Sequence, residues 1–189
     1  KNREQAGRLN RKSSGGVAMT EHKINITQGE YATSDNENVV ITTLLGSCVS
    51  CCLWDPIAGV GGMNHMLLAR GESGDGMNNL AGVNAMEIVI NEMIKLGAVR
   101  SRMQAKAFGG ARMVSGLSDI GKSNSDFTLE FLAREGIECL GHSLGGTASR
   151  NVKFWPFSGR VLQRQSGTKV VEAVATPTPV ESGNDMELF

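Results

Sequence analysis

The feature that most constrains the fold is a pair of apolar segments, each long enough for a buried strand, joined by a short turn. Val49–Trp54 is apolar almost throughout, and Val60–Leu68 returns with a similar character. Between them, Asp55-Pro56 opens a turn that Gly59 can close. A third segment, Val39–Leu45, is β-branched and apolar and predicts the strand that leads into this pair. The pattern therefore predicts a set of neighbouring, buried strands.

The remainder of the chain alternates helical and strand-like patterns. In Asn79–Leu96 the apolar residues follow a helical period, and Gly97 stands where a helix C-cap belongs. About seven strands and two or three helices, with hairpins mixed among helical crossovers, predict an α+β fold with a mixed sheet or two stacked sheets. The other expected elements are a helix over Ser125–Gly136 and strands over Gln104–Phe108, Ile137–His142, Val152–Trp155 and Arg160–Gln165.

The 189 residues suffice for one domain with its own core, flanked by two tails. We expect a flexible tail over residues 1–20, a folded domain over residues 21–167 and a second flexible tail over residues 168–189. The terminal MELF is interpreted as part of a solvated tail or as a docking peptide for a partner. The charged, glycine-rich stretch Ala69–Met77 predicts a mobile loop and a candidate lid.

Composition narrows the class of protein. The formal net charge is zero, which gives no basis for nucleic-acid binding, where a strongly basic face is expected. No apolar run is long enough to span a bilayer, and no apolar core follows the basic N-terminus as it would in a secretory signal. Three of the four cysteines lie within five residues, which does not suit a simple disulfide framework. We therefore expect a cytoplasmic protein without membrane insertion.

Cys48 and His65 form the first candidate site. Cys48 follows the tight Gly46-Ser47 element, and His65 lies on the returning strand-like segment. A cysteine thiol becomes a strong nucleophile once a base removes its proton, and a histidine on a neighbouring strand is a suitable base. Thr42, six residues before Cys48, is expected to hold the imidazole in the required tautomer through its hydroxyl or its carbonyl.

The alternative is that Cys48 is a small buried apolar residue and His65 a satisfied core histidine. Two further features favour the functional interpretation. Gly61-Gly62 thins the returning strand, so that a backbone or a substrate can approach closely. Asn64 places a second polar group beside the histidine in an apolar strand, which costs stability unless that group is used or satisfied.

Other motifs are weaker. GHSLGG, residues 141–146, matches the nucleophile elbow of esterases, but no histidine follows Ser143, so we interpret it as a glycine-rich turn after a strand. FGGARM, residues 108–113, is expected to form a tight turn or a wall of the active cleft. A metal site is disfavoured because Cys139 and His142 supply only a weak second ligand pair. If Val49–Trp54 is a strand, Cys48 and Cys51 also face opposite sides. We therefore expect no metal and no redox pair. The potential metal ligands weighed were Cys48, Cys51, Cys52, Cys139, His65 and His142.

Several sequence blocks, in one order, resemble the chemoreceptor glutamine deamidases of bacterial chemotaxis, the CheD family. The resemblance covers roughly residues 24–162. One departure is Ser149-Arg150, where members of the family often have Gly-Arg, which leaves the local turn geometry open. The matching blocks are LGSCVSCCLWDP, VGGMNHMLL, AMEIVINEMIKLGA, AKAFGGARM, IGKSN, LGG, RNVKF and SGRV.

The resemblance implies an α/β/β-type sandwich similar to that of toxin deamidases, and an enzyme without a cofactor. It implies Cys48 as nucleophile, His65 as base and Thr42 as the third member of the site, with backbone N–H groups of Ser47 and Cys48 as oxyanion donors. The implied reaction hydrolyses selected glutamine side chains of chemoreceptor cytoplasmic helices to glutamate and ammonia. A CheC-type phosphatase is an implied partner.

Two rival functions stay open at this point. One is a non-catalytic adaptor that binds chemoreceptors or a response-regulator phosphatase, with Cys48 chemically idle. The other is a cysteine hydrolase of the same fold that acts on another substrate, such as a methyl ester.

Overall fold

The structure is a computed structural model that describes residues 20–68, 74–113, 120–166 and 187–188. The predicted N-terminal tail therefore lies almost wholly outside the described residues. Of the predicted loop and candidate lid, residues 69–73 lie outside them, while residues 74–77 belong to a helix. Of the predicted C-terminal tail, only residues 187–188 are described, as a short strand beside the last strand of the domain.

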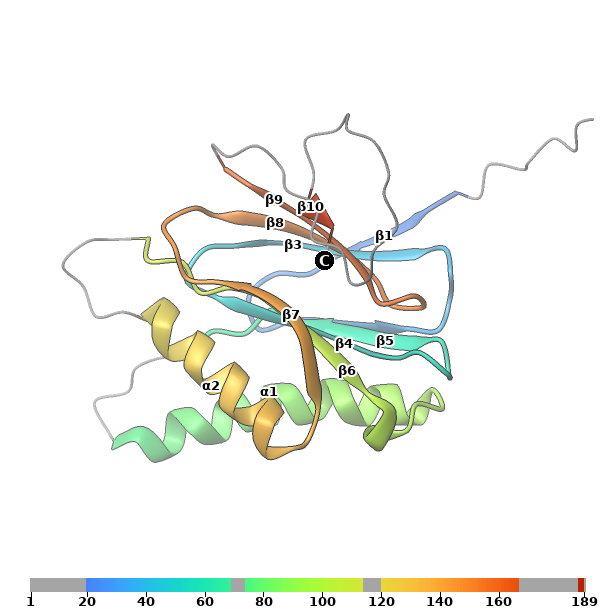
Figure 1. Ribbon diagram of the computed structural model, residues 1–189, viewed down its shortest axis with the longest axis horizontal. Coiled ribbons are helices and arrows are strands. Elements are labelled where there is room, and N and C mark those ends of the chain that lie inside the picture. Colours follow the sequence, from blue (N-terminus) through green and yellow to red (C-terminus); the bar gives the residue numbers. More distant parts are fainter. Residues whose placement is uncertain (1–19, 69–73, 114–119, 167–186, 189) are drawn as a thin grey trace, which may run out of the picture.

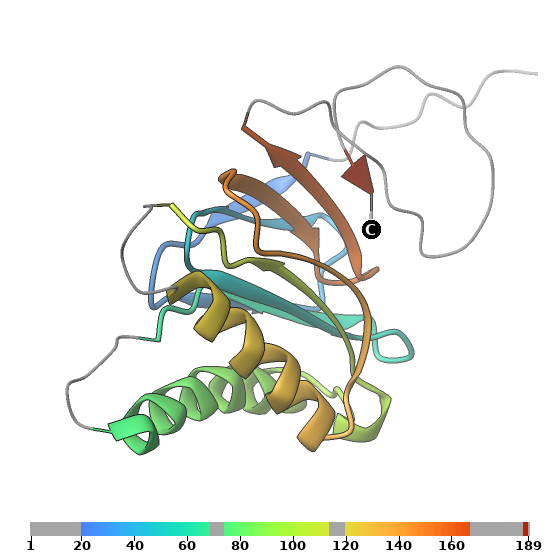
Figure 2. The ribbon, with the colours of Figure 1, turned by 60° about the vertical axis from the view of Figure 1, so that its left-hand side comes forward.

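Two five-stranded sheets and two α-helices form three layers, which Figures 1 and 2 show from two directions. Neither helix is both long and apolar enough to cross a membrane, as far as the described residues go. The elements are β1 (His22–Asn25), β2 (Tyr31–Ser34), β3 (Val39–Leu45), β4 (Val49–Asp55), β5 (Val60–Asn64), α1 (Gly74–Lys95), the 3-10 turn η1 (Arg100–Arg102), β6 (Gln104–Gly109), α2 (Ile120–Arg134), β7 (Glu138–Leu144), β8 (Arg150–Trp155), β9 (Arg160–Gln165) and β10 (Glu187–Leu188).

The outer sheet has the strand order β1-β3-β8-β9-β10, and the middle sheet has the order β2-β5-β4-β6-β7. Each sheet contains one parallel pair, β1 with β3 and β6 with β7, among antiparallel neighbours. Both helices pack on the middle sheet, on the face away from the outer sheet. The predicted α+β class with two stacked sheets is confirmed, and the layers follow the order helix, sheet, sheet.

Two apolar cores separate these layers, and β4 contributes to both. All seven residues of β4 are buried, because one face meets the helices and the other meets the outer sheet. Cys51 packs in the helix-side core, whereas Cys48 and Cys52 pack between the sheets. Burial on both faces explains why this strand reads as a continuous apolar run in the sequence.

Both helices begin earlier than the sequence pattern predicts, and each contains a glycine that is placed by close packing. Gly121, in the first turn of α2, lies so close to the backbone of Gly110 that a Cβ atom there would collide with it. Gly82 lies inside α1, where a Cβ atom would stand 2.5 Å from the ring of Phe127. Glycine is disfavoured inside a helix, but at these two positions it permits close contacts between elements.

Three strands were missed, and one is shorter than predicted. β1, β2 and β10 are short strands at or near the sheet edges, and every residue of β1 is exposed, so no apolar alternation marks it. β5 ends at Asn64 because the side-chain oxygen of Asn64 accepts the N–H of Cys51 (2.9 Å) in place of a ladder carbonyl.

The turn at Ser149, where members of the family often have glycine, needs no left-handed backbone conformation. Among the described residues no non-glycine residue has a positive φ, so Ser149 fits its turn without backbone strain.

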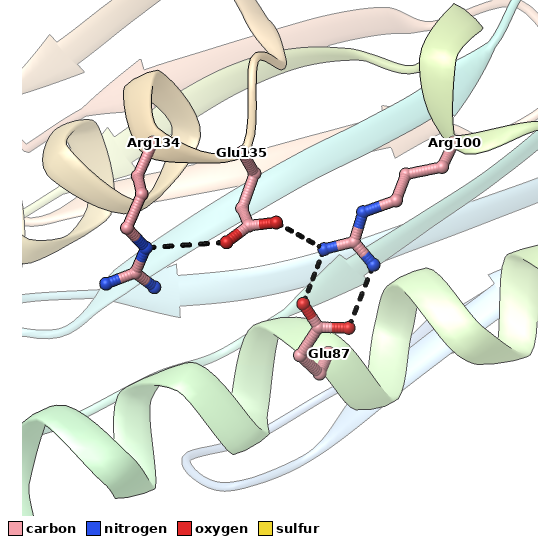
Figure 3. Close-up of polar contacts among 4 residues, drawn as sticks. All are labelled: Glu87, Arg100, Arg134 and Glu135. Carbon is pink, nitrogen blue, oxygen red and sulfur yellow. Dashed lines mark hydrogen bonds and ion pairs between the residues drawn. The ribbon is translucent and has the colours of Figure 1, made fainter.

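An ion-pair network joins the middle of α1 to the C-terminal end of α2 through η1 (Figure 3). Arg100, in η1, binds both carboxylate oxygens of Glu87 on α1 and one oxygen of Glu135 just after α2. Arg134 adds a longer contact of 3.4 Å to Glu135. The bonds from Arg100 hold the pKa of the Glu87 carboxyl below its usual range. The network connects helices that are otherwise linked mainly through the middle sheet.

A second anchor lies at the end of β4. The buried carboxylate of Asp55 accepts the N–H groups of Ile57 and Ala58 in the following turn and the N–H of Val99 before η1. Arg102 adds bonds of 2.9 and 2.7 Å to one carboxylate oxygen. Burial alone would raise the pKa of this carboxyl, but the bonds from Arg102 and the backbone outweigh burial and hold the pKa well below its usual range.

Candidate active site

The turn Gly46–Cys48 is held from behind by all three of its carbonyl groups. In chain order these carbonyls accept hydrogen bonds from Ala111 N, Asn124 Nδ2 and Gly110 N, each 2.8 Å long. The FGGARM segment therefore forms the wall behind Cys48. Gly109 can have no side chain because a Cβ atom there would collide with the carbonyl of Cys48.

The backbone N–H groups of the same turn, unlike its carbonyl groups, are not bound by the described segments around it. Neither the backbone N–H of Ser47 nor that of Cys48 donates to another described residue, and the Cys48 N–H interacts only with its own sulfur, where it partly offsets the effect of burial on the pKa of the thiol. Since the carbonyls are fixed on the protein side, two neighbouring N–H groups beside the sulfur are left unused. Paired backbone donors of this kind can stabilise an oxyanion.

The pairing of β4 with the returning chain places Cys48 and His65 on one face of the middle sheet. The bridge between Val49 and Met66 continues the antiparallel register of β4 and β5. In this register His65 stands opposite Ser50, and Cys48 is the diagonal neighbour of His65 on the face toward the outer sheet. Diagonal neighbours on one face are within reach of long side chains.

The imidazole of His65 is held by a hydroxyl from the outer sheet. Thr43 Oγ1 lies 2.8 Å from His65 Nδ1 and also donates to the carbonyl of Ile26, again at 2.8 Å. The single hydroxyl proton is used toward Ile26, so the oxygen must accept from His65, and Nδ1 carries the proton. Nε2 is then free to act as a base.

This arrangement corrects the expectation that Thr42 holds the imidazole. The hydroxyl of Thr42 lies 3.4 Å from the carbonyl of Ile24 and 3.2 Å from Asn25 Oδ1, and the carbonyl of Thr42 accepts the N–H of Ile26. The physical reason is the two-residue period of β3, which turns neighbouring side chains to opposite faces. Thr43 faces the inter-sheet space and His65, whereas Thr42 faces away.

Burial sets the resting charge of the pair. Cys48 is 9% exposed and His65 7% exposed. Burial raises the pKa of the Cys48 thiol. Burial also lowers the pKa of His65, an effect that the charge of Glu30 and a backbone hydrogen bond at Ile26 only partly offset. Both directions favour a neutral thiol beside a neutral imidazole near pH 7.

The structure adds two residues that sequence reasoning did not find. Asn124, fully buried on α2, donates to the carbonyl of Ser47 and accepts the N–H of Leu68 through Oδ1 (2.9 Å). It thus links the cysteine turn to the segment that follows His65. A buried asparagine on the apolar face of a helix was the one available signal. The second residue is Gln28, whose Oε1 accepts the Cys48 thiol at 3.8 Å.

The weaker sequence candidates have structural roles. Asn64 is satisfied by Cys51 N on β4 and by Ala85 O on α1. Gly61-Gly62 leaves room for this chain's own packing, because a Cβ at Gly62 would meet Val89 of α1.

Ser143 of GHSLGG lies in β7 itself and accepts bonds from Arg150 Nε (3.2 Å) and Gln163 Nε2 (2.8 Å). Cys139 packs with the helix-side core that contains Cys51, away from the face that bears Cys48. The described residues contain no cluster of metal-binding side chains.

Comparison with known proteins identifies the family to which the chain is related. The family model described as "CheD chemotactic sensory transduction" matches residues 69–165. A protein of Caulobacter vibrioides (strain NA1000 / CB15N) is 46% identical over 176 residues, which cover 88% of this chain and 93% of that protein. A protein of Agrobacterium fabrum is 44% identical over 174 residues, with 88% and 96% covered. Both are named "Probable chemoreceptor glutamine deamidase CheD".

The family model begins after His65, but an alignment over 88% of a chain of 189 residues necessarily includes positions 48 and 65. Among solved structures, the Bacillus licheniformis hypothetical protein YfiH matches with a TM-score of 0.43 and 12% identity, over 68% of this chain and 61% of that one. The sequence matches establish the family, and this chain belongs to the CheD family.

Proposed function

We propose that this chain is a protein-glutamine deamidase that hydrolyses glutamine side chains of chemoreceptors to glutamate, with Cys48 as nucleophile and His65 as base. The printed names of its relatives give the reaction and the substrate class. The observation that carries the proposal is the Cys48 turn, where the sulfur lies beside two unused backbone N–H groups and on the same face as a histidine of fixed tautomer.

The first half of the reaction forms a thioester. His65 Nε2 takes the proton from the thiol as the sulfur attacks the Cδ carbon of the glutamine side chain. The N–H groups of Ser47 and Cys48 receive the negative charge that develops on the amide oxygen. His65 then gives its proton to the departing nitrogen, which leaves as ammonia. General acid–base help of this kind contributes roughly 10²–10⁴ in rate.

The second half returns the enzyme to its starting state. His65 takes a proton from water, the resulting hydroxide attacks the thioester carbon, and the sulfur leaves with a proton as glutamate forms. The neutral resting pair suits this sequence, because His65 must accept a proton in each half. Thr43 acts in both halves by keeping Nε2 free of a proton at rest.

The test is the identity of the product. A cytoplasmic receptor fragment is incubated with the protein, released ammonia is measured, and each glutamine is mapped by mass spectrometry for conversion to glutamate. We expect ammonia and new glutamates from the wild type and almost none from His65→Ala. Folded wild-type protein that binds the fragment but converts no glutamine would favour the adaptor function. Methanol release from methylated receptor without ammonia would favour an esterase.

A further inference from the structure

The sulfur of Cys48 is covered by a glutamine of the same chain. Cys48 Sγ donates to Gln28 Oε1 at 3.8 Å, and within the described residues no hydrogen bond joins the sulfur to His65. Gln28 is exposed, whereas Cys48 is 9% exposed. The Gln28 side chain therefore lies on the solvent side of the nucleophile.

The turn that carries Gln28 is fixed to the backbone of His65. Glu30 N donates to Thr27 O (2.9 Å), and Glu30 Oε2 accepts both the N–H and the hydroxyl of Thr27. Gly29 N donates to His65 O (2.8 Å), and His65 N donates to Glu30 O (2.9 Å). The position of Gln28 is thus set by the same segment that presents the base.

The covering group is a primary carboxamide, the chemical group on which the proposed reaction acts. Its oxygen accepts the thiol proton and has no recorded bond to the N–H groups of Ser47 and Cys48 in the described residues. In this pose the carbonyl is not activated, and the thiol proton is directed toward Gln28 instead of His65 Nε2. The pose is therefore unreactive.

We propose that Gln28 is an internal substrate mimic, which occupies the carboxamide subsite in the resting enzyme and is displaced by a receptor glutamine. This inference rests on the proposed function and names the place where the substrate carboxamide binds. When Gln28 leaves, the thiol turns toward His65, so the unprotected nucleophile exists only when a competing carboxamide is present. A thiol is a weak hydrogen-bond donor, so the expected cost to substrate binding is small, roughly two- to fivefold in KM.

The experiment compares Gln28→Ala with wild type in two assays. The first measures the rate at which iodoacetamide alkylates Cys48, with the partly exposed Cys139 of the same molecule as the internal reference. The second measures KM and kcat for ammonia release from a receptor fragment. The control is Gln104→Ala, which changes the same residue type at the opposite end of β4, where Gln104 pairs with Trp54.

We expect Gln28→Ala to speed alkylation of Cys48 severalfold relative to Cys139 and to lower KM roughly two- to fivefold, with kcat nearly unchanged. Gln104→Ala should change neither. Peptide mapping should find Gln28 unconverted in the wild type after long incubation, as the unreactive pose requires.

Three outcomes overturn the inference. Unchanged alkylation would mean that Gln28 does not cover the sulfur. A raised KM would mean that Gln28 binds the substrate and does not compete with it. Conversion of Gln28 to glutamate that depends on Cys48 would mean that the pose is reactive. Failure of the proposed function can be told apart from these three outcomes, because neither the wild type nor any variant would then release ammonia, whatever the alkylation rates. In that case the role of Gln28 as a substrate mimic would be refuted as well.

Discussion

Adjacent threonines on β3 allow a direct test of how the base is held. Thr43→Val replaces the hydroxyl beside His65 Nδ1 with a methyl group of similar size. Thr42→Val makes the same change one residue earlier, where the hydroxyl has, among the described residues, the longer contacts to Ile24 and Asn25. Both threonines are buried, at 1% and 3% exposed, so each variant is a matched control for the other.

The expected loss follows from the bonds that Thr43→Val removes. His65 Nδ1–H and the carbonyl of Ile26 each lose a partner in a buried place. A buried polar group without its partner costs about 1–3 kcal/mol. If that energy is lost from the reactive tautomer of His65, kcat falls about fivefold to 150-fold, since 1.36 kcal/mol corresponds to about tenfold. Thr43→Ser restores the hydroxyl and should recover most of the rate.

The assay is ammonia release from a receptor fragment at saturating and limiting substrate, well below the unfolding temperature of every variant. We expect Thr43→Val to lower kcat with little change in KM, and Thr42→Val to lose less than about threefold, as for a weak exchangeable hydrogen bond. A Thr42→Val loss as large as that of Thr43→Val, or a wild-type kcat in Thr43→Val, would refute this account of the tautomer.

Three further results are expected. Because burial lowers the pKa of His65, the acid limb of kcat/KM should have its midpoint below the ordinary histidine value of 6.5, and a midpoint above 6.5 would contradict the buried neutral base. Asn124→Ala should lower kcat about tenfold or more, whereas Thr128→Val, at an equally buried position of α2, should leave kcat near the wild-type value. If the two variants are equally stable and lose the same fraction of kcat, Asn124 has no positioning role. Asp55→Asn should lower the free energy of unfolding by about 2–3 kcal/mol at pH 7, a modest value because the side chain of Arg102 is 33% exposed. The pKa of Asp55 in the folded state is depressed, so the stability difference between wild type and Asp55→Asn should shrink as the pH falls below the ordinary aspartate pKa of 3.8. Urea unfolding at several pH values measures this difference. A difference that does not change with pH would contradict a stabilising, ionised Asp55.

The central strands and the placement of Cys48 with His65 on one face could be predicted because they depend on local information. The period of two fixes which side chains share a face, and the turn after Asp55 fixes how β5 returns beside β4. The same period could have separated Thr43 from Thr42, since Thr43 shares its face with apolar neighbours that point into the core.

The rest of the site depends on contacts between segments that are far apart in the sequence. Asn124 reaches a carbonyl 77 positions away, and Gln28 meets a sulfur 20 positions away. No spacing rule predicts either contact, because each is set by how α2 and the turn after β1 pack against the middle sheet. β1 itself has no apolar alternation and is recognised only by its parallel pairing with β3.

The most direct measurement of the central claim compares Cys48→Ala with Cys52→Ala. Both cysteines lie on the same face, between the sheets, and both are buried. With each variant shown to be folded, ammonia release from a receptor fragment should vanish in Cys48→Ala and stay near the wild-type rate in Cys52→Ala. Ammonia release at the wild-type rate by folded Cys48→Ala would contradict the claim that this sulfur performs the reaction.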